Sequence, residues 1–162
     1  MTSSAFLIFH VVLSLIAIGA GFVVVWGMLT GRRLDSWNAY FLGTTIATSV
    51  TGFGFPFHGF KPPHYVGVLS LIVLAIACLA RYRFHLEGSW RRVYIITALI
   101  ALWFNVFVGV VQSFLKIPAL HALAPKGSEP PFAIAQSAVL LIFIAIGVLA
   151  VRQRYSMPIS ST

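Results

Sequence analysis

The chain has 162 residues, of which 59% are hydrophobic and 9% are charged, and its formal net charge is +8. Because an ordinary soluble domain is about 25% charged, this composition and a mean hydropathy of +0.96 indicate an integral membrane protein. A positive charge of this size would suggest nucleic acid as the partner of a soluble protein. Here the basic residues lie beside apolar segments, so we expect contact with lipid and no nucleic-acid partner.

Five segments are apolar enough and long enough to cross the hydrocarbon core of a bilayer, which takes about 20 residues of helix. They cover approximately residues 5–30, 37–57, 64–84, 91–115 and 132–151. The first is too long for a signal peptide and has no basic start, so we expect it to remain in the protein. The second is the least apolar, since it holds four threonines and a serine. The sequence predicts an all-α membrane protein: one domain over residues 1–162 that forms a bundle of five transmembrane helices.

The arginines occupy alternate connections between these segments. Arg32 and Arg33 follow the first segment, four arginines between residues 81 and 92 flank the turn after the third, and Arg152 and Arg154 follow the fifth. Lys and Arg are enriched in the cytoplasmic loops of membrane proteins. If the second segment did not cross, the arginines would lie on both sides of the membrane. We therefore expect five crossings, with the N-terminus outside and the C-terminus in the cytoplasm.

In this orientation, most polar side chains within the spans fall in the outer half of the bundle. Polar groups in hydrocarbon need partners, so these side chains should face the interior. His10 is the most informative, because it is the one ionisable side chain well inside a predicted span. Two interpretations remain open: hydrogen bonds that join helices, or a pocket open to the outside for a small ligand. The candidate ligand-binding residues are His10, Ser14, Thr48, Asn105, Gln112 and Gln136.

Four of the five histidines lie toward the outer face, which suggests a metal or haem site as an alternative. Neutral imidazole binds copper and zinc, and a b-type haem needs an axial histidine. No two histidines are three or four residues apart, so coordination would depend on the loops. A quinone or other amphiphile needs only an aromatic-lined slot with a few hydrogen-bonding groups. The candidate metal ligands are His10, His58, His64, His121 and Glu129.

The sequence offers no catalytic residues. The acidic residues Asp35, Glu87 and Glu129 all lie outside the predicted spans, which argues against a proton-driven transporter. No paired carboxylates, nucleophile–base motif or glycine-rich phosphate loop can be read. We therefore expect a protein that is not an enzyme.

Two stretches resemble small multi-pass proteins of the bacterial inner membrane. They are TGFGFPF at residues 51–57, and the run from Asn105 through Gln112 to LHALAP at 120–125 and SEPPF at 128–132. The resemblance implies the same location but brings no activity and no site residues with it. We expect a non-enzymatic protein that binds a small amphiphilic ligand or cofactor near the periplasmic face, or that joins a larger membrane complex or a homo-oligomer. The alternative is a redox protein that binds haem or copper through its outer histidines.

Overall fold

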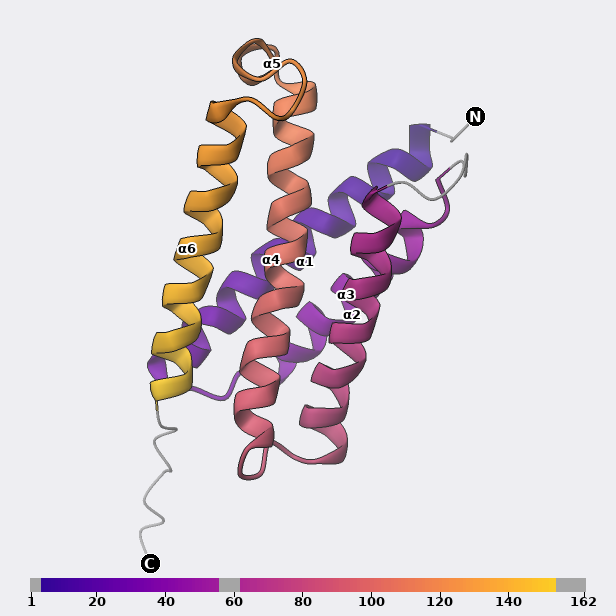
Figure 1. Cartoon of the computed structure of the whole chain (residues 1–162). Coiled ribbons are helices and arrows are strands. Elements are labelled where there is room, and N and C mark those ends of the chain that lie inside the picture. The colour runs from indigo at the N-terminus through magenta and orange to yellow at the C-terminus, as the bar shows by residue number, and fades with distance from the viewer. Residues whose placement is uncertain (1–3, 56–61, 154–162) are drawn as a thin grey trace, which may run out of the picture.

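The computed structural model describes residues 4–55 and 62–153, and every regular element in these two stretches is a helix (Figure 1). The elements in chain order are α1 (Ser4–Thr30), α2 (Asp35–Gly52), α3 (Pro62–Cys78), the π-helix η1 (Leu79–Arg83), α4 (Trp90–Lys116), α5 (Pro118–Leu123) and α6 (Pro130–Arg152). The prediction of an all-helical chain is therefore confirmed. The short helix α5 has no counterpart among the predicted segments. It begins at Pro118, whose fixed φ suits the first turn of a helix.

Four helical segments are long and apolar enough to cross a membrane: α1, α4, α6 and the stretch His64–Arg83, which joins α3 to η1. They match four of the five predicted spans, as expected for an all-α membrane protein. The segment predicted at 37–57 corresponds to α2, which starts at Asp35 and ends at Gly52. Glycine weakens a helix, so Gly52 and Gly54 favour the earlier end. Hydroxyl and amide side chains make α2 less apolar than the other four segments.

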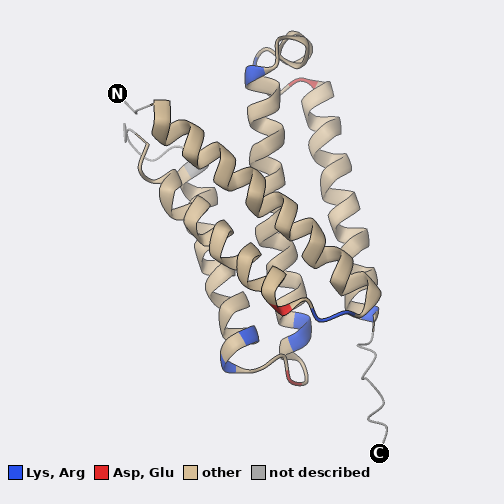
Figure 2. Ribbon diagram, turned by 180° about the vertical axis from the view of Figure 1, so that it is seen from behind, with Lys and Arg blue, Asp and Glu red and all other residues tan. Residues whose placement is uncertain are grey.

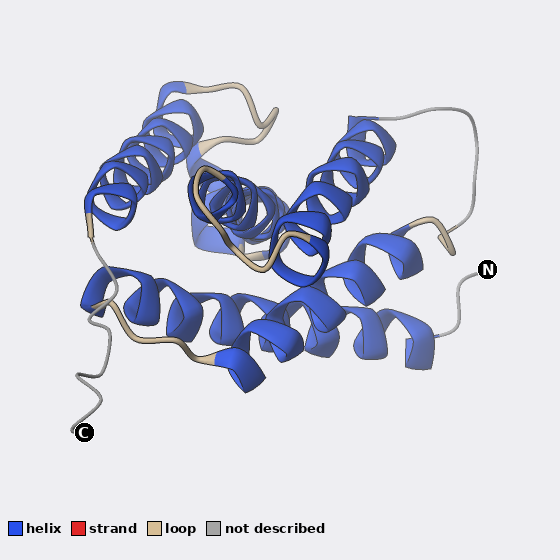
Figure 3. Cartoon of the chain, turned by 90° about the horizontal axis from the view of Figure 1, so that it is seen from below, coloured by secondary structure: helices blue, strands red, loops and turns tan. Residues whose placement is uncertain are grey.

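The helices form two layers, with α1 and α2 side by side in one and α3, α4 and α6 in the other (Figure 3). Helix α4 is central, because it contacts each of the other five α-helices. Small side chains let the helices approach closely in this core. Alanines with no more than 5% exposure recur on α1, α3, η1, α4 and α6, and α2 adds the buried Phe41 and Leu42 to this core. These alanines are Ala17, Ala20, Ala77, Ala80, Ala98, Ala101 and Ala150.

The described arginines gather at one end of the bundle, as Figure 2 shows. Arg81, on η1, is 9% exposed and forms an ion pair with Asp35 at the start of α2. The guanidinium also lies over the ring of Tyr94, 5.4 Å from its centroid. Tyr94 donates its hydroxyl to Oδ1 of Asn38, and Asn38 donates to the carbonyl of Leu34 at 2.6 Å. These contacts fix the first turn of α2 against η1 and α4.

Gly21 of α1, Phe41 of α2 and Leu102 of α4 meet in the middle of the bundle. A Cβ at Gly21 would overlap Cδ1 of Leu102 and lie 3.0 Å from Cε2 of Phe41. Both side chains are 1% exposed, so neither can move aside into a less crowded position. Gly21 is therefore the position at which α1 and α4 pack without a side chain between them.

We predict that Gly21→Ala lowers the free energy of unfolding in detergent by about 1–3 kcal/mol relative to Gly19→Ala, because an overpacked core must distort to fit the added methyl group. Gly19 is the matched control, since it lies on the same helix and a Cβ there would meet nothing within 4 Å. The gain in helix propensity from Gly to Ala is shared by both variants and cancels. Equal unfolding curves for the two variants would show that this packing is absent.

Candidate functional site

The outer halves of α1 and α2 are joined by a hydrogen bond between His10 and Thr51. The two atoms, Nδ1 and Oγ1, are 2.8 Å apart, and the imidazole packs edge-on against Phe55 with 5.1 Å between the ring centroids. The Thr51 hydroxyl donates to the carbonyl of Ala47 at 2.8 Å, so its oxygen accepts from the protonated Nδ1 of His10. This assignment leaves Nε2 of His10 as a hydrogen-bond acceptor or metal ligand.

The second polar contact of this region joins α2 to α4. Nδ2 of Asn105 donates to Oγ1 of Thr45 over 3.5 Å, at the long limit of a hydrogen bond. Thr45 is fully buried. Ser49, on the same side of α2, bonds Ser70 of α3 at 3.0 Å between their hydroxyl oxygens. Helix α2 therefore makes polar contacts with each of its three neighbours, α1, α3 and α4.

Thr48 lies between these contacts and has none of its own. It is 8% exposed, and its Oγ1 is buried without a hydrogen-bond partner in the described part of the chain. The hydroxyls of Ser14 and Thr44 behave differently, because each donates to the carbonyl four residues earlier, as Thr51 does. The hydroxyl of Thr48 is thus the group that a bound molecule would satisfy.

Ser14 completes this region, although its hydroxyl is committed to the carbonyl of His10 at 2.8 Å. Helices α1 and α2 run antiparallel, with His10 opposite Thr51 and Gly21 against Phe41, which puts Ser14 at the level of Thr48. We refer to the group on α1, α2 and α4 as the polar cluster. Its members are His10, Ser14, Thr45, Thr48, Thr51 and Asn105.

The structure divides the predicted ligand-binding residues. His10, Ser14, Thr48 and Asn105 belong to the polar cluster. Gln136, on α6, instead donates Nε2 to the carbonyl of Phe107 at 3.2 Å. Phe107 and Asn105 are two residues apart, about 200° around α4, so Gln136 lies on the opposite face of that helix. Gln112 is exposed on α4 and is not a member of the polar cluster.

The predicted metal ligands are spread over several elements. His64 is in the first turn of α3, with its ring 6.0 Å from that of Phe53, and His121 is exposed on α5. His58 lies outside the described residues. Within residues 4–55 and 62–153, no three His, Cys, Asp or Glu side chains are grouped closely enough to hold a metal ion. The metal site stays a prediction, because it includes His58.

Glu129 stabilises the loop that leads into α6. Its carboxylate accepts hydrogen bonds from the backbone N–H groups of Lys126 at 2.9 Å and Ser128 at 3.0 Å. The bond from Lys126 is the largest of the effects that hold the pKa of Glu129 below its ordinary value. Glu129 is also the residue that precedes α6, but its side chain makes no hydrogen bond to the first turn of that helix.

Sequence reasoning missed some of the partners of the polar residues. Ser70 received no role because it is a lone hydroxyl in an apolar segment. The available signal was on α2, where Thr45, Thr48 and Ser49 follow the spacing of one helical face. Such a face predicts polar partners on every helix packed against it.

Comparison of the chain with protein-family models, curated proteins and solved structures gave no match. The chemistry of the polar cluster therefore has to follow from its own groups. It combines a hydroxyl, an imidazole nitrogen and an amide, with no acidic side chain among them. Such a set can hydrogen-bond a neutral molecule, whereas a charged one would be poorly compensated.

We predict that the loop before α6 becomes less stable as the pH falls. Because the pKa of Glu129 is lowered on folding, its carboxylate stabilises the loop above the ordinary value of 4.5, and this contribution is lost as the pH falls through the lower folded value. The protection factors of the Lys126 and Ser128 amides against hydrogen exchange should fall over that range, and Glu129→Gln should remove this pH dependence. Glu87→Gln is the control for the loss of one carboxylate elsewhere. The same pH dependence in wild type and Glu129→Gln would contradict this role.

Proposed function

We propose that this chain is a five-span protein of the bacterial inner membrane, with its N-terminus in the periplasm and its C-terminus in the cytoplasm. In this proposal it is not an enzyme, and it binds a small neutral amphiphile in the polar cluster. The observation that carries the proposal is the hydroxyl of Thr48, which is buried without a partner between the contacts of His10 and Asn105.

The ends of α2 support a fifth crossing. Asp35 begins the helix beside Arg81, at the arginine end, whereas Thr51 in its last turn bonds His10 near the N-terminus of α1. At about 1.5 Å per residue, the 18 residues of α2 span about 27 Å, close to the hydrocarbon thickness of about 30 Å. Trp37 and Tyr40 are 46% and 66% exposed near its arginine end, as aromatic side chains at a membrane interface are.

The hydroxyl of Thr48 supports a ligand because a buried hydroxyl without a hydrogen bond destabilises the protein. A buried hydroxyl without a partner costs about 1–3 kcal/mol, and no water in hydrocarbon can replace the bond. A molecule that bonds Thr48 would recover that free energy and could also donate to Nε2 of His10 or Oδ1 of Asn105. Because the cluster holds no carboxylate, the polar head of this molecule is expected to be neutral. A quinone or another amphiphile with a small polar head has this chemistry.

We predict opposite labelling of two sets of engineered cysteines. In a Cys78→Ala background, a membrane-impermeant maleimide should label Phe53→Cys and Ser128→Cys in intact cells with a permeable outer membrane, and Ser89→Cys only after the inner membrane is opened. All three positions are exposed in the structure. This pattern follows if α2 crosses and the arginines stay in the cytoplasm. If α2 turned back instead, Phe53→Cys and Ser128→Cys would be protected in intact cells and Ser89→Cys would be labelled.

We predict that Thr48→Val and Thr51→Val have opposite effects. Thr48→Val should reduce the amount of bound amphiphile about tenfold and leave the stability of the ligand-free protein equal or higher, because it removes a hydroxyl without a partner. Thr51→Val should lower the free energy of unfolding by about 1 kcal/mol, because it removes the partner of His10.

Bound molecules would be identified by mass spectrometry of apolar extracts from purified protein, with the host membrane as the reference. An absorption spectrum and metal analysis of the same sample would detect haem or copper. The ligand proposal fails if no molecule is enriched over the host membrane, or if Thr48→Val retains as much of it as the wild type.

A further inference from the structure

A second pair of buried polar groups without partners lies on the other side of α4. Nε1 of Trp103 and Oε1 of Gln136 are buried, and neither has a hydrogen-bond partner among the described residues. Trp103 belongs to α4 and Gln136 to α6, the two helices that pack against each other there. We call this region the α4–α6 seam and define it by Trp103, Phe107, Phe114, Phe132 and Gln136.

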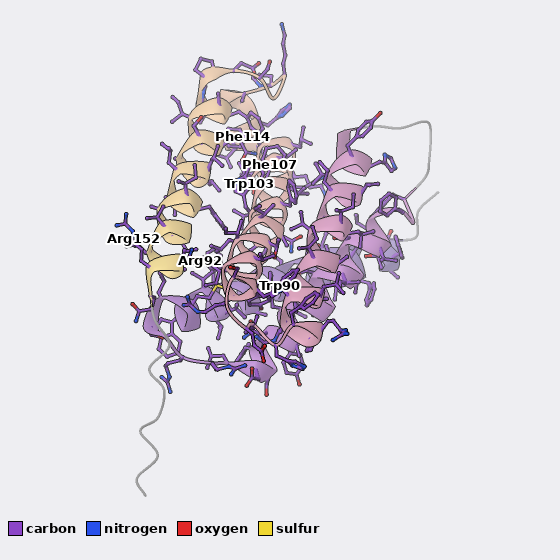
Figure 4. All side chains as sticks on the ribbon, turned by 60° about the horizontal axis from the view of Figure 1, so that its bottom comes forward. Trp90, Arg92, Trp103, Phe107, Phe114 and Arg152 are labelled. Atoms are coloured by element: carbon purple, nitrogen blue, oxygen red, sulfur yellow. The ribbon has the colours of Figure 1, made fainter. Side chains whose placement is uncertain are left out.

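Both groups lie beside Phe107. The rings of Trp103 and Phe107 are 5.6 Å apart between centroids, and the amide of Gln136 bonds the carbonyl of Phe107 at 3.2 Å. Figure 4 shows Trp103, Phe107 and Phe114 in a row along α4, on the side of α6. The seam continues beyond them, where Phe114 meets Phe132 edge-on with 5.4 Å between centroids. The two polar groups therefore lie among aromatic rings.

The orientation of the Gln136 amide follows from its partner. A carbonyl oxygen can only accept a hydrogen bond, so the amide must turn its nitrogen toward Phe107. This leaves Oε1 as the unsatisfied atom. The indole of Trp103 has a single polar group, an N–H that can only donate. The seam therefore lacks one acceptor for Trp103 and one donor for Gln136.

A single hydroxyl group has both of the missing functions. Its oxygen is an acceptor, which Nε1 of Trp103 requires, and its hydrogen is a donor, which Oε1 of Gln136 requires. A water molecule would leave its second hydrogen without a partner, since buried waters make about three hydrogen bonds. In an alcohol, a carbon atom replaces that second hydrogen, and the aromatic lining suits the apolar remainder of the molecule.

We propose that the α4–α6 seam binds the hydroxyl head of an apolar molecule that enters from the bilayer. Helix α6 leaves large apolar side chains exposed beside the seam, among them Leu140 and Leu141 at 41% and 66% exposure, so lipid-soluble molecules can reach it laterally. The seam and the polar cluster lie on opposite faces of α4. This site is therefore independent of the function proposed for Thr48 and His10.

The test uses a long-chain primary alcohol that carries bromine on its second carbon, adjacent to the carbon that bears the hydroxyl, and the methyl ether of the same compound. Bromine quenches tryptophan on contact. The full chain with Trp26, Trp37 and Trp90 replaced by Phe would be placed in phosphatidylcholine vesicles, so that Trp103 alone reports. We expect saturable quenching by the alcohol, at a mole fraction about tenfold lower than for the ether, which has no hydrogen to donate.

Gln136→Leu should raise the mole fraction needed for quenching by the alcohol about tenfold and leave quenching by the ether unchanged. Ser137→Ala, an exposed neighbour on α6, should change neither. The proposal is overturned if quenching rises linearly with either compound and is insensitive to Gln136→Leu, which is the behaviour of a probe dissolved in the bilayer.

A second measurement keeps the four tryptophans. In the fluorotryptophan-labelled full chain, the fluorine resonance that disappears in Trp103→Phe should shift on addition of the unbrominated alcohol. If that resonance responds to exchange of H2O for D2O and not to the alcohol, an ordered water fills the site and the proposal is wrong. Because the readout is at Trp103, failure here leaves the polar cluster untouched, and loss of ligand in Thr48→Val leaves this site untouched.

Discussion

The fold depends on one constraint, which is that the polar side chains of α2 must find partners inside an otherwise apolar bundle. A hydroxyl or amide that faced hydrocarbon would cost several kcal/mol, so the polar stripe of α2 has to turn inward. The stripe makes hydrogen bonds to each neighbouring helix. Asn38 bonds Tyr94 of α4, Ser49 bonds Ser70 of α3, and Thr51 bonds His10 of α1. Once these contacts are made, the position of α2 within the bundle is fixed.

The same constraint explains why the middle of α2 differs from its ends. Phe41 and Leu42 are buried at 1% and 2% exposure, and Phe41 lies with Leu102 against Gly21, so this layer of the bundle is apolar. Polar contacts therefore occur above and below it: the network of Arg81 at the arginine end and the polar cluster at the other. Helix α4 contributes to both polar regions, because Tyr94 lies in its first two turns and Asn105 lies beyond its midpoint. This apolar layer thus separates the polar cluster from the end of the bundle that carries the arginines (Figure 2).

Sequence alone was enough to predict the helices whose signal is uniform. The lengths of α1, α4 and α6 follow from long apolar runs without charge, and the end of η1 at Arg83 follows from the basic turn after it. The extent of α2 was harder to predict, because a threonine-rich segment has a weak hydropathy signal. The helix also ends at Gly52, earlier than the apolar run suggests. The direction in which the polar side chains of the candidate site point could not be predicted. Gln112 and Gln136 were assigned with His10, yet only packing decides which way a side chain points around a helix.

A Ser or Thr hydroxyl in a helix can donate a hydrogen bond to the carbonyl four residues earlier. A buried polar group that lacks such a bond is therefore a stronger indication of a ligand than a buried polar residue alone. Ser14, Thr44, Thr97 and Ser113 all use that carbonyl, so their presence inside the bundle requires no other molecule. Thr48 has the same chemistry and the same backbone, and yet its oxygen is left without a bond. Trp103 has no such local partner available, because its indole cannot fold back to its own helix. Both groups are therefore left without a hydrogen-bond partner among the described residues, and the two proposed binding sites rest on this observation.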